Sequence, residues 1–251
     1  MRLAVISDIH ANLPALEAVL ADIRGRGVDA IINLGDCAAG PLWPRETLDL
    51  LAAEGMATVR GNHDRWLYER PPERLPPVDR FALSELSADQ CRAMYDLPAT
   101  IEVSDEILAV HGTPSDDSTY LTEETLENRM LPATRALIAE RLGAEMGRAV
   151  ILCGHSHRQS VTQVPDGPMI LNPGTVGCPV FADIPSAHRI EPRSPHARYA
   201  ILTRRGGRFG AEMFALDYDW HRSAARALDV GFPRWAEAYA TGSVLSEVLA
   251  E

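Results

Sequence analysis

The stretch Gly61-Asn62-His63-Asp64 places an amide, an imidazole and a carboxylate on consecutive residues, shortly after the apolar run 57–59. Its glycine lets the backbone turn tightly. Four other apolar runs end in similar side chains: 3–6 leads to Asp8 and His10, 30–34 to Asp36, 107–110 to His111, and 149–152 to His155 and His157. Because ligands bind beyond the carboxyl ends of the strands in open α/β sheets, we expect these five loops to meet at one site.

The remaining elements are predicted from hydrophobic spacing and from helix and turn signals. Asn12 should cap a helix that ends near Gly25, and a second helix over 44–54 completes a β-α-β-α-β start, as in a parallel sheet covered by helices. Further strands are expected near 100–103, 106–110, 160–164, 168–171, 197–203 and 208–214, and helices near 122–130 and 133–142.

Three segments differ from this α/β pattern. Prolines divide 65–99 into short helical pieces around 80–86 and 88–96, and we expect this segment to overhang the site. The segment 178–196 holds four prolines without periodicity and is predicted to be a surface loop. The tail 217–251 is predicted to be helical, with its aromatic residues in the core. No repeat or clean linker divides the chain, which favours a single domain over 1–251.

Composition excludes several classes of partner. The formal charge of −11 argues against tight, sequence-independent binding to nucleic acid, which depends on neutralising phosphates with Lys and Arg. No stretch approaches the ~20 apolar residues of a membrane helix, and the N-terminus lacks the pattern of a secretory signal. The four cysteines are widely spaced and form no CxxC, so we expect free thiols and a cytoplasmic location. Whether the chain forms homo-oligomers stays open.

The polar residues at the strand ends are typical metal ligands. A lone His or Asp in such a place is usually an ordinary polar residue or a cap, but five of the chain's eight histidines fall in these short windows. Imidazole and carboxylate together suit Mn, Fe, Ni, Zn or Co, whereas a site for Mg or Ca alone is expected to hold only oxygen. Seven candidates are too many for one tetrahedral ion but suit two ions that share a carboxylate. They are Asp8, His10, Asp36, Asn62, His111, His155 and His157.

As an ordered set, these motifs resemble those of the calcineurin-like metallophosphoesterases. The matching stretches are Asp8-Ile9-His10, Gly35-Asp36, Gly61-Asn62-His63-Asp64, His111-Gly112 and Gly154-His155-Ser156-His157. Residues 7–12 and Asn172-Pro173-Gly174-Thr175-Val176-Gly177 are similar, more narrowly, to small bacterial and archaeal phosphodiesterases and diadenosine tetraphosphatase-like enzymes.

The resemblance implies a fold and a metal site. The fold is an α/β four-layer α/β/β/α sandwich of two mixed sheets, with two divalent transition-metal ions at one edge, Mn²⁺ being the first choice. Asp8, His10 and His157 would bind one ion and Asn62, His111 and His155 the other, with Asp36 bridging both.

His63 is the natural general acid, because it lies beside a ligand without being one in the family pattern and can be charged near neutral pH. The alternative is a helix N-terminal residue bonded only to the backbone. Asp64 either orients His63 or caps the following helix. These two roles stay open.

The residue that binds the substrate phosphate is harder to find. Related small enzymes often carry Pro-Arg soon after the Asn-Pro-Gly motif, where this chain has Pro179-Val180. Arg60, Arg65 and Arg158 are the candidates to replace that arginine.

Our leading hypothesis is a metal-dependent phosphoesterase acting on a small phosphodiester or nucleotide-type substrate, in which a metal-bridging hydroxide attacks phosphorus and His63 protonates the leaving group. A phosphoprotein phosphatase is an alternative, although Ala39, Gly40 and Asp64 stand where those enzymes carry Asp, Arg and Glu. A metal-binding scaffold without catalysis is a second alternative. A nuclease is disfavoured by the net charge.

Overall fold

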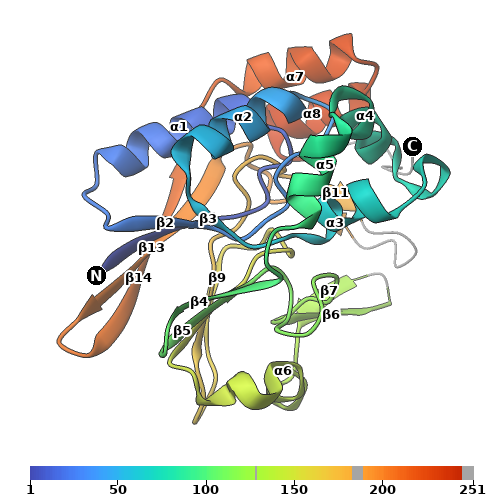
Figure 1. Cartoon of the computed structure of the whole chain (residues 1–251). Coiled ribbons are helices and arrows are strands. Elements are labelled where there is room, and N and C mark those ends of the chain that lie inside the picture. The colour runs from blue at the N-terminus through green and yellow to red at the C-terminus, as the bar shows by residue number, and fades with distance from the viewer. Residues whose placement is uncertain (128, 183–188, 245–251) are drawn as a thin grey trace.

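Two five-stranded mixed sheets form the centre of the protein, and the computed structural model describes residues 1–127, 129–182 and 189–244 (Figure 1). The first sheet has the order β14 (Arg208–Leu216), β13 (Ala197–Arg205), β1 (Arg2–Ile6), β2 (Ala30–Asn33), β3 (Ala57–Thr58). The second has the order β4 (Thr100–Ser104), β5 (Ile107–Val110), β8 (Val150–Leu152), β10 (Met169–Asn172), β9 (Ser160–Gln163). β1, β2 and β3 are mutually parallel, as are β5, β8 and β10.

The alternation of side chains along β1 explains the layers. Leu3 and Val5 pack between the two sheets, whereas Ala4 and Ile6 face the opposite side and pack with the buried side of α1 (Leu13–Arg24). In Figure 1, α1 and α2 (Pro44–Glu54) lie over the first sheet. α6 (Arg135–Leu142) covers the second sheet. The predicted α/β/β/α sandwich is therefore confirmed.

The proline-interrupted segment is helical, as predicted. It contains α3 (Asn62–Glu69), the 3₁₀ turn η1 (Pro72–Arg74), α4 (Pro77–Glu85) and α5 (Ala88–Tyr95). A small apolar cluster joins it to the loop after β2: Ala38, Ala39, Leu67, Leu75, Ala82 and Met94. The helical tail is also confirmed where it is described, as α7 (Trp220–Asp229) and α8 (Pro233–Thr241), while residues 245–251 of this prediction lie outside the described residues. No helix in the described part of the chain has the length and apolar character needed to cross a membrane.

Two sequence-based expectations are wrong. Residues 122–130 do not form a helix: β6 (Glu123–Leu126) and β7 (Arg129–Pro132) pair as an antiparallel hairpin, because pairing in the folded chain overrides the helix preference of the glutamates. The segment 178–196 is not simply a surface loop. Cys178 and Val180 are buried, and β11 (Phe181–Ala182) pairs with β12 (Arg189–Ile190), while residues 183–188 of this prediction lie outside the described residues.

Candidate metal centre

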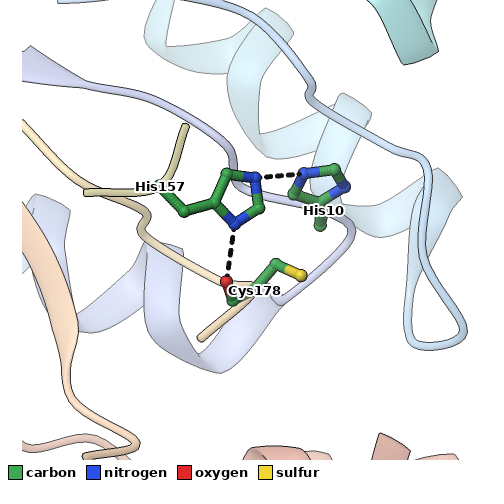
Figure 2. A group of neighbouring side chains, drawn as sticks. All are labelled: His10, His157 and Cys178. Atoms are coloured by element: carbon green, nitrogen blue, oxygen red, sulfur yellow. Dashed lines mark hydrogen bonds between the residues drawn. The ribbon is translucent and has the colours of Figure 1, made fainter. Parts of the chain in front are cut away.

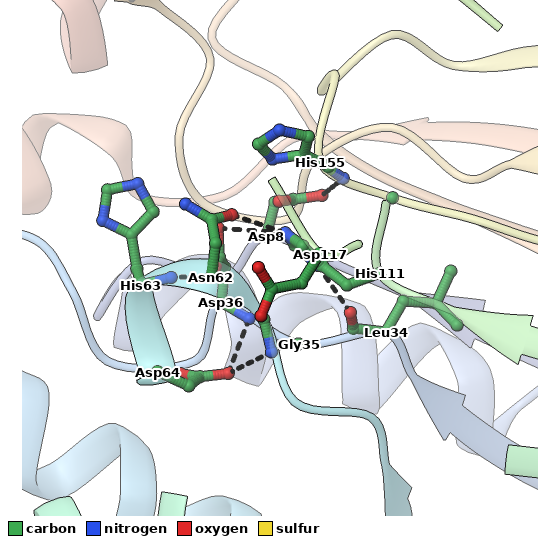
Figure 3. A network of polar contacts seen from close by, with 12 residues as sticks. Asp8, Leu34, Gly35, Asp36, Asn62, His63, Asp64, His111, Asp117 and His155 are labelled. Atoms are coloured by element: carbon green, nitrogen blue, oxygen red, sulfur yellow. Dashed lines mark hydrogen bonds and ion pairs between the residues drawn. The ribbon is translucent and has the colours of Figure 1, made fainter. Parts of the chain in front are cut away.

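The seven candidate ligands come together at the carboxyl ends of β1, β2, β3, β5 and β8. Figure 3 shows Asp8, Asp36, Asn62, His111 and His155 turned toward one space, although they come from both sheets. The remaining two, His10 and His157, join them from the loops after β1 and β8: their Nε2 atoms are 3.2 Å apart. The structure thus brings together every ligand candidate that the sequence predicts.

The backbone at these positions is strained. Nine non-glycine residues in the described part of the chain have positive φ, and five of them are candidate ligands. These are Asp8 (55°), His10 (47°), Asp36 (56°), His155 (64°) and His157 (55°). Each such residue costs on the order of 1–3 kcal/mol, and strain of this kind persists where the surroundings enforce it, typically at functional sites.

Two glycines allow the loops to approach one another closely. A Cβ atom at Gly61 would lie 2.1 Å from Asp36 Oδ1, and a Cβ at Gly154 would lie 2.0 Å from Ser7 Oγ. Neither distance is possible for a real side chain. The glycines of the third and fifth motifs are therefore needed because other loops pass against them.

Three histidines are oriented by the same kind of hydrogen bond, which ring Nδ1 donates to a backbone carbonyl. The pairs are His10 with Ala39 (2.7 Å), His111 with Leu34 (2.7 Å) and His157 with Cys178 (2.8 Å; Figure 2). Such a bond fixes the tautomer and leaves the lone pair of Nε2 for a metal ion.

The donor atoms fit two ions that share a carboxylate. One group of mutually close donors is Asp8, His10 and Asp36, and a second is Asp36, His111 and His155, with the atoms of each group within 4.8 Å of one another. Asp36 belongs to both groups. Asp8 Oδ1 is buried without a hydrogen-bond partner among the described residues, and it lies 3.3 Å from Nε2 of His157, so an anionic oxygen faces the cluster.

The protonation of the cluster also fits metal binding. Burial lowers the pKa of His10 to about 4 and that of His155 to about 3, so both rings are neutral and able to bind a metal. Burial also disfavours a charged His111, but the Asp36 carboxylate outweighs it and raises the pKa of His111 to about 10. A bound cation would displace that proton.

A third group of close donors was not predicted from the sequence. Cys178 lies with His10 and His157, and its thiol donates a hydrogen bond to the carbonyl of Val180 at 3.3 Å. Burial raises the pKa of this thiol. Cys178 directly follows the motif at 172–177, which is the sequence signal that could have marked it as a neighbour of the cluster.

His63 lies beside the ligands and belongs to none of the donor groups found among the described residues. Its backbone N–H donates to Asp36 Oδ1 at 2.9 Å, and its ring Nδ1 is 2.8 Å from Oδ2 of Asp79, which α4 holds in a fully buried position. Burial lowers the pKa of His63, but Asp79 and then Asp36 outweigh it and raise it to about 9. His63 is therefore charged at neutral pH, with Nε2 as the nitrogen not bound to Asp79.

The two open roles of Asp64 are now separated. Its carboxylate accepts backbone N–H bonds from Gly61 (3.0 Å), Asp36 (2.9 Å) and Cys37 (2.9 Å). Asp64 thus caps α3 and fixes the loop that carries the shared ligand (Figure 3). The carboxylate that orients His63 is Asp79, which sequence patterns do not reveal because no motif surrounds it.

A cavity of about 640 Å³ opens above the cluster, and ligand residues form part of its wall. Aromatic rings pack against three of its histidines: Trp66 on His63, Tyr120 on His155 and Phe181 on His157, with ring centroids 4.7, 4.6 and 4.5 Å apart. The cavity therefore combines a polar floor with apolar walls, as small-molecule sites commonly do.

The predicted phosphate-binding arginines do not line this cavity. Arg60 donates to the carbonyl of Tyr95 and borders a separate, smaller cavity, Arg65 is paired with Asp117, and Arg158 is exposed outside the lining. Arg70 and Arg74, at the end of α3 and in η1, line the cavity instead. Their place depends on how the segment 65–99 folds back, which local sequence does not reveal.

Comparison with known proteins agrees with the fold. The crystal structure of a metallophosphoesterase from Sphaerobacter thermophilus matches with a TM-score of 0.72 and 26% identity, over 97% of this chain and 100% of that one. A hypothetical protein from Pyrococcus horikoshii shares the fold, with a TM-score of 0.74 and 17% identity over 97% and 99% of the two chains. An uncharacterized protein from Methanocaldococcus jannaschii is 24% identical, over 93% of this chain and 94% of its own.

The sequence model of the calcineurin-like phosphoesterase superfamily domain matches residues 1–194, which include every candidate ligand and His63. The chain therefore belongs to the calcineurin-like phosphoesterase superfamily and is a metal-dependent phosphoester hydrolase.

Proposed function

We propose that the protein hydrolyses a small phosphodiester or nucleotide-type substrate, with His63 as the general acid. The observation that carries this proposal is the placement of His63 on the cavity wall, bonded to Asp79 and next to the shared ligand Asp36. A cavity of about 640 Å³ is in the usual range for small-molecule sites, which favours a small substrate over a folded phosphoprotein.

Two divalent ions, with Mn²⁺ as the first choice, would polarise the phosphoryl oxygens and make a water molecule more acidic. Asp8, His10 and His157 would hold one ion and Asn62, His111 and His155 the other, with Asp36 held by both. The carbonyls of Ala39, Leu34 and Cys178 keep three of the imidazoles turned for this purpose.

His63 would donate the proton that the departing oxygen needs. Its charged form persists at neutral pH because Asp79 and Asp36 lie close to it, and Asp79 holds Nδ1 so that Nε2 is the donor. The backbone bond from His63 to Asp36 fixes the distance between the acid and the shared ligand. A scaffold that binds metal without catalysis has no use for this charged pair.

The reducing cytoplasm is the compartment we propose. All four cysteines are buried free thiols, as expected for a protein that is not oxidised during export.

The test is hydrolysis of bis-p-nitrophenyl phosphate and of p-nitrophenyl phosphate by chelator-stripped protein, before and after Mn²⁺ is added. We expect metal-restored turnover that is stronger on the diester. His63→Gln should keep its metal content and lose about 10²-fold or more in turnover on substrates with poor leaving groups. His221→Gln, on the exposed side of α7, is the matched control and should behave as wild type. Absence of turnover with every divalent ion, despite two bound metals per chain, would favour the scaffold.

A further inference from the structure

Three residues that line the cavity, His63, Trp66 and Arg70, contact one another in that order, beginning at the proposed acid. The indole of Trp66 lies against the imidazole of His63, with ring centroids 4.7 Å apart. The guanidinium of Arg70, one helical turn further along the chain from Trp66, lies over the same indole with Cζ 3.6 Å from the ring centroid. Trp66 thus contacts both the proposed proton donor and a cation that also lines the cavity.

Arg70 differs from its neighbour Arg65 in the groups that balance its charge. Arg65 donates two hydrogen bonds to the carboxylate of Asp117, at 2.8 and 2.7 Å, and a third to Glu69 at 2.8 Å. In the described part of the chain, no carboxylate lies within ion-pair distance of Arg70, whose contact is the indole face of Trp66. Of these two arginines, Arg70 is the one with hydrogen-bond donors to spare.

This unpaired cation is also partly removed from water. Burial, and then the nearby charge of Arg65, lower the pKa of Arg70, which means that its surroundings disfavour the charge. The indole N–H of Trp66 is buried and has no hydrogen-bond partner among the described residues. A buried donor without a partner is costly, and the buried indole N–H is not itself open to the cavity. Arg70 is therefore the group of this pair that can donate hydrogen bonds to an anion in the cavity.

The cavity is also larger than a phosphoryl group on the metal cluster requires. Its volume of about 640 Å³ leaves room for an organic group beside Trp66, Leu75 and Trp235. Val180, which follows Pro179 where related enzymes often carry an arginine, is fully buried among apolar residues and provides no charge. Arg70, in the segment 65–99, provides a cationic group in the lining of the cavity instead.

We propose that Arg70, held over the indole ring of Trp66, binds a second anionic group carried by the leaving part of the substrate. This inference rests on the proposed function, because His63 marks the side on which the leaving group departs and Trp66 places Arg70 on that side. The substrate class is then a phosphodiester or phosphoanhydride whose leaving group bears a further phosphate or carboxylate. The metal cluster and Arg70 bind the two anionic groups at different places in one cavity.

The test compares two probes that differ by one negative charge. Phenylphosphonate and 4-carboxyphenylphosphonate carry the same phosphonate for the metal cluster, and neither can be hydrolysed at a P–O ester bond. Their binding to Mn²⁺-loaded protein is measured by calorimetry. We expect wild type to bind the carboxylated probe at least about tenfold more tightly, and Arg70→Gln to lose that preference, because a hydrogen bond to a charged group is removed.

Three further variants make the result specific. Arg70→Lys keeps the charge without the planar stack and should retain part of the preference. Arg158→Gln removes the exposed arginine that the sequence suggested, and Arg92→Gln removes an exposed arginine of α5; both should keep the full preference. Thermal unfolding of each variant checks that the fold is intact.

The outcomes separate this inference from the proposed function. Equal binding of the two probes by wild type, no binding of either, or an unchanged preference in Arg70→Gln would each overturn the role of Arg70. Loss of the preference in Arg158→Gln instead would assign the anion site to Arg158. Absence of turnover on bis-p-nitrophenyl phosphate, together with an Arg70-dependent preference in binding, would contradict the proposed function and leave the anion site in place.

Discussion

His63 and Asp79 are joined by a 2.8 Å hydrogen bond from ring Nδ1 to carboxylate Oδ2, although α3 and α4 supply them from either side of a proline-rich turn. Asp79 is fully buried, and its other oxygen, Oδ1, has no hydrogen-bond partner among the described residues. A buried carboxylate needs a compensating charge, and His63 provides it. The segment 65–99 thus does more than cover the cavity, because it fixes the group we propose as the acid.

Asp79→Asn should lower turnover without removing the metal ions. The amide can still accept a hydrogen bond from Nδ1, but it no longer stabilises the charged ring, so we expect a loss of about tenfold or more in kcat on substrates with poor leaving groups. Steady-state kinetics and metal analysis of the same samples check this. Asp89→Asn, on the exposed face of α5, is the control. A normal kcat in Asp79→Asn would remove the pair from the mechanism.

The dependence of kcat/KM on pH should also reflect the interaction between His63 and Asp79. The pKa of His63 is raised to about 9, so its protonated form is present below that pH and is lost as the pH rises through it. We expect kcat/KM to fall on the alkaline side for this reason. In Asp79→Asn the larger of the two charges that raise this pKa is gone, so the fall in kcat/KM should begin at lower pH. A fall in kcat/KM at the same pH in wild type and in Asp79→Asn would show that another group controls the alkaline side of the profile.

The clustering of the candidate metal ligands could be predicted from sequence, whereas the residues that support them could not. Asp8 and Asp36 follow neighbouring parallel strands of one sheet, so local pattern and sheet geometry suffice for them. His111 follows a strand of the second sheet, and its place beside them depends on how the two sheets pack. Asp79 and Arg70 lie in a segment whose path depends on packing with the loop after β2. Nothing in their immediate sequence marks them.

The hairpin of β6 and β7 illustrates the same limit for secondary structure. Residues 122–130 are rich in glutamate and favour a helix locally, yet Glu123 is buried and bonded to Thr122, and the strand pairs with β7. Strand pairing between β6 and β7 in the folded chain therefore determined the secondary structure of these residues. Propensity is a weak guide where tertiary contacts are available.

Removal of the shared ligand should affect both ions at once. Asp36 belongs to both oxygen-containing donor groups, so we expect Asp36→Asn to lower the bound metal from two ions per chain toward one or none. In wild type, Mn²⁺ at 100 times its Kd should stabilise the fold by about 2.7 kcal/mol per site, and this gain should largely vanish in Asp36→Asn. Metal analysis and thermal unfolding with and without Mn²⁺ measure both effects. Retention of two ions in Asp36→Asn would contradict the shared role.

Gly61→Ala tests whether the close approach of two loops, rather than backbone freedom, makes this glycine necessary. Gly61 has φ −85°, which alanine also adopts, but its Cβ would lie 2.1 Å from Asp36 Oδ1 and 2.4 Å from Asp36 N. The loop carrying the shared ligand must therefore move, at a cost of about 1–3 kcal/mol, and metal binding should weaken.

Gly55→Ala is the matched control, because Gly55 has φ +60° with open space around its Cβ position. That variant should lose on the order of 1 kcal/mol from backbone strain and keep its metal. Chemical unfolding and metal titration of the two variants separate the causes, since equal metal affinities would show that the approach of Gly61 to Asp36 does not support the site.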